Sequence, residues 1–493
     1  MFALLREFPA VRPSALAATH PYGYLVRPTN STIICPPRNT SSMRRDLEAH
    51  ADDPTPPPAR VTDQPLRRTR SGMFLSLRVR NFRVFMAGQS ISVAGNWMQN
   101  VAVGWLVLNL THSGGALGLI TACRYAPLLL LGAWGGLVAD RWDKRRLLQI
   151  TAAAELLIAA ALGGLTLTHT IGVWSLTALI LAVGVVDIVD TPTRQTIIST
   201  LVGRDRLANA IALNSILVNA ARVVGPGAAG LLIATFGVGA CFLINAATYI
   251  AAITGLHLLR VSELIVSAPE IRAKRQIRAG LDYVRRTPHL RTPLILVAVS
   301  GAFTWEFQVT LPLFTSTTFQ GDSRAYGWAF TSLATGSILG GLLSARRRTV
   351  NIWAVAVSAA LWGVVILAAA AAPNLAIAYP LLGLVGAGAV TFNSVTKTLL
   401  QTDSIEQMRG RIMALWSIGW QGTTVVGAPA VGYIGQWLGA RYALGFGGLA
   451  TLVGGVFLLL ARRDDMMDAL SWRMARRSAS EEPTASTLKP GST

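Results

Sequence analysis

Ionisable residues inside long apolar runs are the first candidates for chemistry in this chain. Glu306 and Arg222 each stand near the middle of such a run, and Asp187 and Asp190 lie one helical turn apart in another. A charge inside a bilayer costs about 2.5–3.5 kcal/mol on insertion scales, so these residues are functional candidates. A carboxyl group that gains and loses a proton as its surroundings change is what proton-coupled transport requires.

Glu306 is the first candidate for that proton-coupling group, with Asp187 second and Arg222 as the natural counter-charge. Trp305 and Phe307 flank Glu306 in sequence. Two alternatives stay open for Glu306: a hydrogen-bonded structural carboxylate, or a contact to the substrate that does no proton work.

Other chemistry finds little support in the residue pattern. Arg124 and Glu155 stand nearer the ends of their apolar runs, which favours charges that reach toward the membrane surface. Cys35, Cys123 and Cys241 and the six histidines show no metal-binding or disulfide spacing. There is no phosphate-binding Walker sequence. The sequence therefore predicts no catalytic residues, no metal, no cofactor and no enzyme.

Membrane helices must position these residues. The 493-residue chain is 52% hydrophobic and 14% charged, against about 25% charge in soluble domains. A spanning helix needs roughly 20 mostly apolar residues. Twelve such segments follow one another, at residues 84–108, 115–139, 147–169, 172–192, 208–234, 238–259, 292–317, 325–345, 351–371, 375–398, 410–436 and 441–461.

The charges between these segments predict the orientation in the membrane. Every even-numbered connection is basic, while the odd-numbered ones carry only Arg324 and Arg441 as basic residues. Lys and Arg mark cytoplasmic loops, so both termini are expected in the cytoplasm and the chain in the inner membrane. The net charge of +20 lies in loops and tails, and this placement argues against a nucleic-acid partner.

The chain divides into five predicted parts. They are a disordered tail (1–75), a six-helix bundle (76–260), a basic cytoplasmic linker (261–291), a second six-helix bundle (292–462) and a cytoplasmic tail (463–493). The first 72 residues hold 11 of the 23 prolines, a composition typical of disorder, and translation starting at Met73 is one interpretation. Residues 212–216 recur in similar form at 414–418, which favours two related halves.

The loop after the second segment contains Gly136, then Asp140-Arg141, then Arg145 in a basic run. This resembles the signature loop between helices 2 and 3 of the major facilitator superfamily, although Asp143 replaces the usual second glycine. The resemblance implies that the loop latches the two halves on the cytoplasmic side, and we expect Arg194 to pair with Asp140. A plain positive loop facing the cytoplasm is the alternative.

The fifth segment carries Gly225-Pro226 and Gly230 among small residues. It is similar to the Gly-Pro motif that antiporters of this superfamily place in helix 5, where it helps to seal the resting protein. Proline introduces a kink, and small residues let a facing helix come close. A general packing surface of small residues is the alternative.

Residues 190–195 and 206–210, with the start of the first segment, narrow the resemblance to the branch of enterobactin exporters and macrolide efflux proteins. It covers about residues 76–462. It implies an all-α protein of twelve transmembrane helices in two bundles, which exports small organic molecules such as drugs or siderophores in exchange for protons by alternating access. We expect the substrate, protons and membrane lipids as partners of a monomer. A solute importer of the same fold and a sensor without transport are the alternatives.

Overall fold

The computed structural model describes residues 74–265, 276–345 and 350–461. Both predicted tails (1–75 and 463–493) lie outside these ranges apart from residues 74 and 75, and so does part of the predicted linker. Within the described ranges all regular structure is helical. The predicted all-α class is therefore confirmed.

The first half contains six long helices after a short turn, η2 (Leu75–Arg78). They are α2 (Arg80–Thr111), α3 (Gly114–Arg141), α4 (Lys144–Leu167), α5 (Val173–Val202), α6 (Arg204–Phe236) and α7 (Val238–His257). Helix α5 continues ten residues past its predicted end at Pro192. That proline leaves the carbonyl of Ile188 without its helical donor, and this oxygen lies against Gly135 of α3, where a Cβ would approach it to 2.2 Å. The packed neighbour makes the interrupted helix tolerable.

The second half begins after η3 (Val261–Glu263) and α8 (Gln276–Arg285), two short helices within the predicted linker. Its elements are α9 (Pro288–Phe303), α10 (Phe307–Leu313), η4 (Phe314–Thr318), α11 (Ser323–Ala345), α12 (Ile352–Ala370), α13 (Leu375–Asp403), α14 (Glu406–Ser417), η5 (Ile418–Gly422), α15 (Thr424–Trp437) and α16 (Ala440–Ala461). Two predicted single runs, 292–317 and 410–436, are thus broken helices. Both contain a π-helical turn, η4 and η5, a feature frequent at functional sites.

All twelve predicted segments coincide with a helix or a broken helix. In the described ranges, nine helices are long and apolar enough to cross a membrane. The segments outside this group of nine are α2, α11 and the α14–α15 run. The count of twelve spans stays a prediction for those three.

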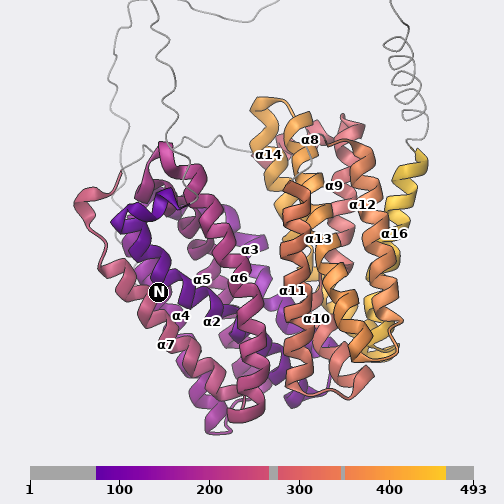
Figure 1. The fold of residues 1–493 in the computed structure, drawn as a ribbon, viewed down its shortest axis with the longest axis horizontal. Coiled ribbons are helices and arrows are strands. Elements are labelled where there is room, and N and C mark those ends of the chain that lie inside the picture. The colour runs from indigo at the N-terminus through magenta and orange to yellow at the C-terminus, as the bar shows by residue number, and fades with distance from the viewer. Residues whose placement is uncertain (1–73, 266–275, 346–349, 462–493) are drawn as a thin grey trace, which may run out of the picture. The chain divides into compact units, whose positions relative to one another are not determined.

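The helices pack mainly within their own half of the chain. In the first half α2 packs against α6 and α7, α3 against α5, and α4 against α5 and α7. In the second half α11 and α12 pack against α13, and α16 packs against α12 and α9. The most extensive contacts between the halves pair α3 with α15 and α6 with α11, and Figure 1 shows the indigo-to-magenta and orange-to-yellow groups that these pairs connect.

Glycines make the closest backbone contacts between the halves. We call Gly114, Gly118, Gly230, Gly327 and Gly432 the glycine seam. A Cβ at Gly118 would lie 2.2 Å from the Ala428 carbonyl oxygen, and one at Gly432 would lie 2.3 Å from that of Gly114. On the other pair of helices, a Cβ at Gly327 would lie 2.7 Å from the Pro226 carbonyl oxygen. Backbones this close require residues without side chains.

Replacing Gly118 with alanine is expected to lower the melting temperature of the purified protein. The new methyl group meets rigid backbone, and overpacking of this kind costs about 1–3 kcal/mol. Gly164 in α4 is the matched control, because a Cβ there would meet nothing within 4 Å. Gly164→Ala should leave the melting temperature unchanged or raise it. Equal melting curves for both variants would contradict the close contact.

Candidate functional site

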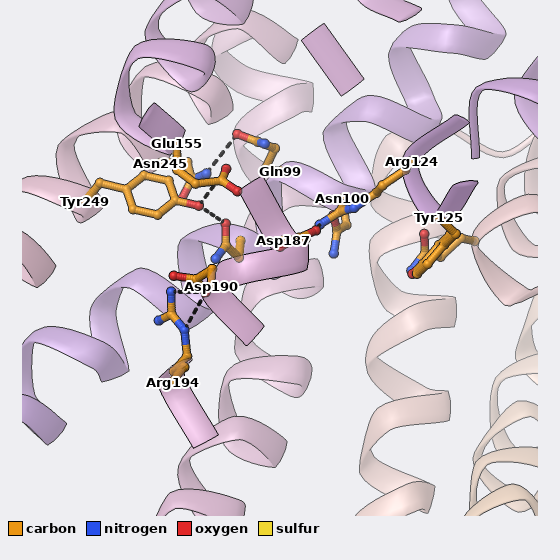
Figure 2. A network of polar contacts seen from close by, with 12 residues as sticks. Gln99, Asn100, Arg124, Tyr125, Glu155, Asp187, Asp190, Arg194, Asn245 and Tyr249 are labelled. Carbon is orange, nitrogen blue, oxygen red and sulfur yellow. Dashed lines mark hydrogen bonds and ion pairs between the residues drawn. The ribbon is translucent and has the colours of Figure 1, made fainter. Parts of the chain in front are cut away.

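A polar network crosses the first half, with an arginine–aspartate pair at one end (Figure 2). Arg124 of α3 and Asp187 of α5 form an ion pair with 3.2 Å between nitrogen and oxygen. Asn100 of α2 accepts a second hydrogen bond from the same guanidinium. Because α5 runs on to Val202, Asp187 stands in the middle of this helix. The pair therefore lies about halfway along the bundle.

Asp190, one turn further along α5, anchors the second part of the network. Its carboxylate accepts hydrogen bonds from Thr151 of α4 at 2.8 Å and from Arg194 Nε at 2.8 Å. The shortest distance of the Arg194–Asp190 ion pair is 2.6 Å. The expected pairing of Arg194 with Asp140 is thus wrong in this structure. Asp140 lies in the last turn of α3, whereas Asp190 is within reach on the same helix as Arg194.

The third part of the network is centred on Tyr249 of α7. Its hydroxyl lies 3.2 Å from Glu155 Oε2 of α4 and also contacts Asn96 of α2. Glu155 is only 5% exposed, so this carboxyl group is enclosed. Beside it Asn245 donates to Gln99 at 2.8 Å. The network therefore ties α2, α4 and α7 together around a buried acid (Figure 2).

Glu306 lies in the second half at the break between α9 and α10. It is the residue before the first turn of α10 and is 3% exposed. Its Oε1 atom is buried and has no hydrogen-bond partner among the described residues. No arginine or lysine of the described ranges forms an ion pair with it.

Aromatic rings surround this part of the second half. The Trp305 and Trp420 rings lie 4.9 Å apart between centroids, and Trp305 also meets Phe307 edge-on at 5.6 Å. Trp420 extends the group to Trp416 and Trp362. These contacts join the break of the α9–α10 run to the π-turn η5. Glu306 therefore sits where two irregular helices and a largely apolar environment coincide.

A hydrogen bond between the halves lies in the region between the first-half network and Glu306. Gln308 of α10 donates to the Tyr125 hydroxyl of α3 at 3.3 Å. Next to it is a cavity of about 20 Å³ whose lining includes Asn100, Arg124 and Gln308. A space of this size holds about one water molecule. The Arg124–Asp187 pair thus faces the contact between the halves.

Arg222 of α6 does not lie beside Glu306 in an ion pair, as its predicted role as counter-charge would require. Its guanidinium lies over the Trp97 ring of α2, 4.7 Å from the centroid. Arg222 Nε is buried without a hydrogen-bond partner among the described residues. The structure therefore separates this cation from both carboxylates proposed for proton coupling.

The predicted gating loop joins α3 and α4. Gly136 is buried, and Arg141 is exposed at the end of α3. Arg145 donates to the last carbonyls of α7, at 2.7 Å to Leu256 and 2.9 Å to His257. These contacts satisfy a helix C-terminus. Arg145 thus holds the loop to its own half, and the latch between halves stays a prediction.

The Gly-Pro motif of α6 lies between α2 and α11. A Cβ at Gly225 would lie 2.7 Å from the Ala94 carbonyl oxygen of α2. At Gly230 it would lie 2.8 Å from that of Ser323, at the start of α11. Pro226 is buried between them, with its carbonyl against Gly327. The motif therefore contributes to the glycine seam.

The ion pair between Arg124 and Asp187 was not predicted from the sequence. Arg124 was expected to act as a charge near the membrane surface, yet it pairs with Asp187. The sequence does contain a signal for this pair, because Arg124 and Asp187 carry opposite charges and lie in two different apolar runs. A charge inside a membrane bundle needs a partner. In the described part of the chain, no group of three or more His, Cys, Asp or Glu could hold a metal ion.

The chain matches a known protein family and several characterised transporters. Residues 71–491 match a family model described as "Transmembrane secretion effector". The chain is 30% identical over 263 residues to the staphyloferrin A transporter of Staphylococcus aureus, covering 53% of this chain and 66% of that relative, just under two thirds of its length. It is 25% identical over 400 residues to the enterobactin exporter EntS of Shigella flexneri, covering 77% and 91%.

A macrolide efflux protein A of Streptococcus pyogenes is 23% identical over 268 residues, with 53% of this chain and 65% of that protein covered. Among solved structures, a bacterial homologue of the human lysosomal transporter Spinster, in an inward-facing and unoccupied conformation, superposes with a TM-score of 0.59. It is 16% identical and covers 78% of this chain and 95% of its own. At this identity the structural likeness concerns the fold.

Proposed function

Since this chain belongs to the transmembrane secretion effectors of the major facilitator superfamily, we propose that it exports small organic molecules in exchange for protons. The observation that carries the proton part is the enclosure of Glu306. An ionised carboxylate with no cation beside it costs several kcal/mol inside a membrane protein. Glu306 therefore holds a proton while it is enclosed in this arrangement and releases it when the helix break opens to water.

The glycine seam suggests how the protein changes conformation during transport. It joins the halves near the α2–α3 turn, the end of α6, the start of α11 and the end of α15. With both termini in the cytoplasm, as the loop charges favour, these ends face outward. The described arrangement is then closed on the outside, and the substrate enters from the cytoplasm. Opening the seam while the cytoplasmic ends approach each other releases it.

The export direction rests on the family and on the relatives. The family is described as a secretion effector, and two similar proteins are an enterobactin exporter and a macrolide efflux protein. We carry this direction over to the present chain. The Gly-Pro motif supports it, because the Pro226 carbonyl lies against Gly327 of the glycine seam. The substrate classes to be tested first are siderophores and macrolides.

Inside-out membrane vesicles test the proposal. Vesicles from cells that produce the chain are energised by ATP hydrolysis, which acidifies the lumen, and are given radiolabelled erythromycin or an iron-free siderophore. We expect accumulation in the lumen that collapses when a protonophore is added. Accumulation only in right-side-out vesicles would establish an importer, and binding without flux in either orientation would establish a sensor. Either result would refute export.

A further inference from the structure

We propose that Arg222, stacked on Trp97, is the binding subsite for an acidic group of the exported molecule, a carboxylate or a comparable oxyanion. This inference rests on the proposed export function and assigns a chemical class to its substrate. It starts from the one property that separates Arg222 from Arg124 and Arg194, two other partly buried arginines of the first six helices.

That property is the lack of an anionic partner. Arg124 and Arg194 each pair with an aspartate, at 3.2 and 2.6 Å. Arg222 has no carboxylate within ion-pair distance among the residues that the structure describes, and its Nε atom is buried and unbonded. Leaving a buried charge without compensation is costly. A site that tolerates this cost is a candidate for a charge that arrives with a ligand.

The position of Arg222 suits a ligand held between the halves. Trp97, beneath the guanidinium, also contacts Phe330 of the second half at 5.9 Å between ring centroids. One residue along, the Val223 carbonyl accepts a hydrogen bond from Thr331 of α11. On the Glu306 side of the same interface, the Tyr125 phenol of α3 accepts a hydrogen bond from Gln308, two residues after Glu306. The unpaired cation and the proposed proton site thus flank the same contact region.

The position of the guanidinium over the Trp97 ring also suits an oxyanion such as a carboxylate. A guanidinium that lies flat on an aromatic ring keeps its N–H groups at the edge of the plane. Two parallel N–H groups match the two oxygens of a carboxylate. The rings of Trp97 and Phe330 make the surroundings of the guanidinium largely apolar.

Three fluorescent probes of one shape separate charge from hydrophobicity: 1-pyrenebutyrate, 1-pyrenebutanol and 1-pyrenebutylamine. Their dissociation constants are measured on the purified full-length chain by quenching of tryptophan emission. We expect wild type to bind the carboxylate at least about tenfold more tightly than the alcohol, and the amine more weakly still. Equal affinity for carboxylate and alcohol in wild type overturns the proposal, whatever the variants do.

Variants assign the preference to the residue. Arg222→Gln is expected to bring the carboxylate-to-alcohol ratio close to one, and Arg222→Lys to keep part of it. Arg286→Gln is the matched control, because Arg286 is an exposed arginine of the linker, and its ratio should equal that of wild type. An unchanged ratio in Arg222→Gln overturns the assignment. A melting curve for each variant confirms that it is folded.

Failure of the subsite and failure of export give different results. If the carboxylate preference is present but vesicles show no proton-driven flux, the subsite stands and the export function falls. If vesicles export erythromycin while the probes show no dependence on charge, export stands and the acidic substrate class falls.

Discussion

Glu306→Gln is expected to abolish proton-driven efflux while leaving downhill exchange of the substrate intact. Glutamine has the size of a protonated glutamate but does not ionise. The carboxyl is enclosed at the break between α9 and α10, with a buried Oε1 and no cation beside it. The substitution therefore preserves the described arrangement and removes only the release of the proton. Uphill transport stops, because nothing couples the proton gradient to the conformational change.

The measurement compares two modes of transport in the same proteoliposomes. Counterflow, in which unlabelled substrate drives the entry of labelled substrate, should proceed at the wild-type rate. Accumulation driven by an imposed pH difference should fall to the level of empty liposomes. Glu263→Gln provides the control, since Glu263 is an acid of η3 with a 42% exposed side chain, and it should keep both modes. Full pH-driven accumulation by Glu306→Gln would exclude Glu306 as the coupling group.

Breaking the Arg124–Asp187 pair is expected to have the second large effect, this time on stability. Asp187→Asn leaves the arginine without its counter-charge in the bundle, and Arg124→Gln does the same to the aspartate. Loss of one partner of a buried pair costs about 3–5 kcal/mol. The cost here should lie toward the lower end of that range, because the Asp187 side chain is 34% exposed. The double variant should recover much of the loss, since it leaves no charge unpaired.

A double-mutant cycle on the melting of the purified protein measures this coupling. The exposed pair Asp282–Arg285, at 3.9 Å with side chains 61% and 70% exposed, serves as the reference cycle. Exposed pairs contribute about 0–1 kcal/mol, so this cycle should show almost no coupling. If the Arg124–Asp187 cycle is equally weak, the pair is not a structural element of the bundle.

The helices could be placed from the sequence because length and apolar character determine what can cross a bilayer. The two breaks could not, because each depends on neighbours. Glu306 lies within an apolar run, yet the chain departs from the helix there. The adjacent α9 approaches η5 so closely that a Cβ at Gly301 would lie 2.3 Å from the Gly419 carbonyl oxygen. Contacts of this kind are set by helix packing, which a single sequence does not specify.

In the candidate site too, some residues could be predicted from the sequence and others depend on how the helices pack. Glu306 was identifiable because a lone acid in an apolar run is conspicuous by itself. The partner of Asp187 was not, since the pairing depends on how α3 and α5 are rotated about their axes. For Arg194, a partner was predicted, but it was not the partner that the structure shows. Proximity of two helix ends suggested Asp140, but Asp190 is four residues away on the same helix and is already in position. Pairing in space follows geometry that charge order along the chain does not contain.

The composition of the glycine seam determines how the contact between the halves responds to salt. Its contacts are made by backbone and by uncharged groups, such as the hydrogen bond from Ser113 to Gln436. No ion pair crosses it in the part of the chain that the structure describes. Dissolved ions screen charges at a protein surface, but they have little to screen here. The strength of this closure should therefore be the same in dilute fresh water and in concentrated brine.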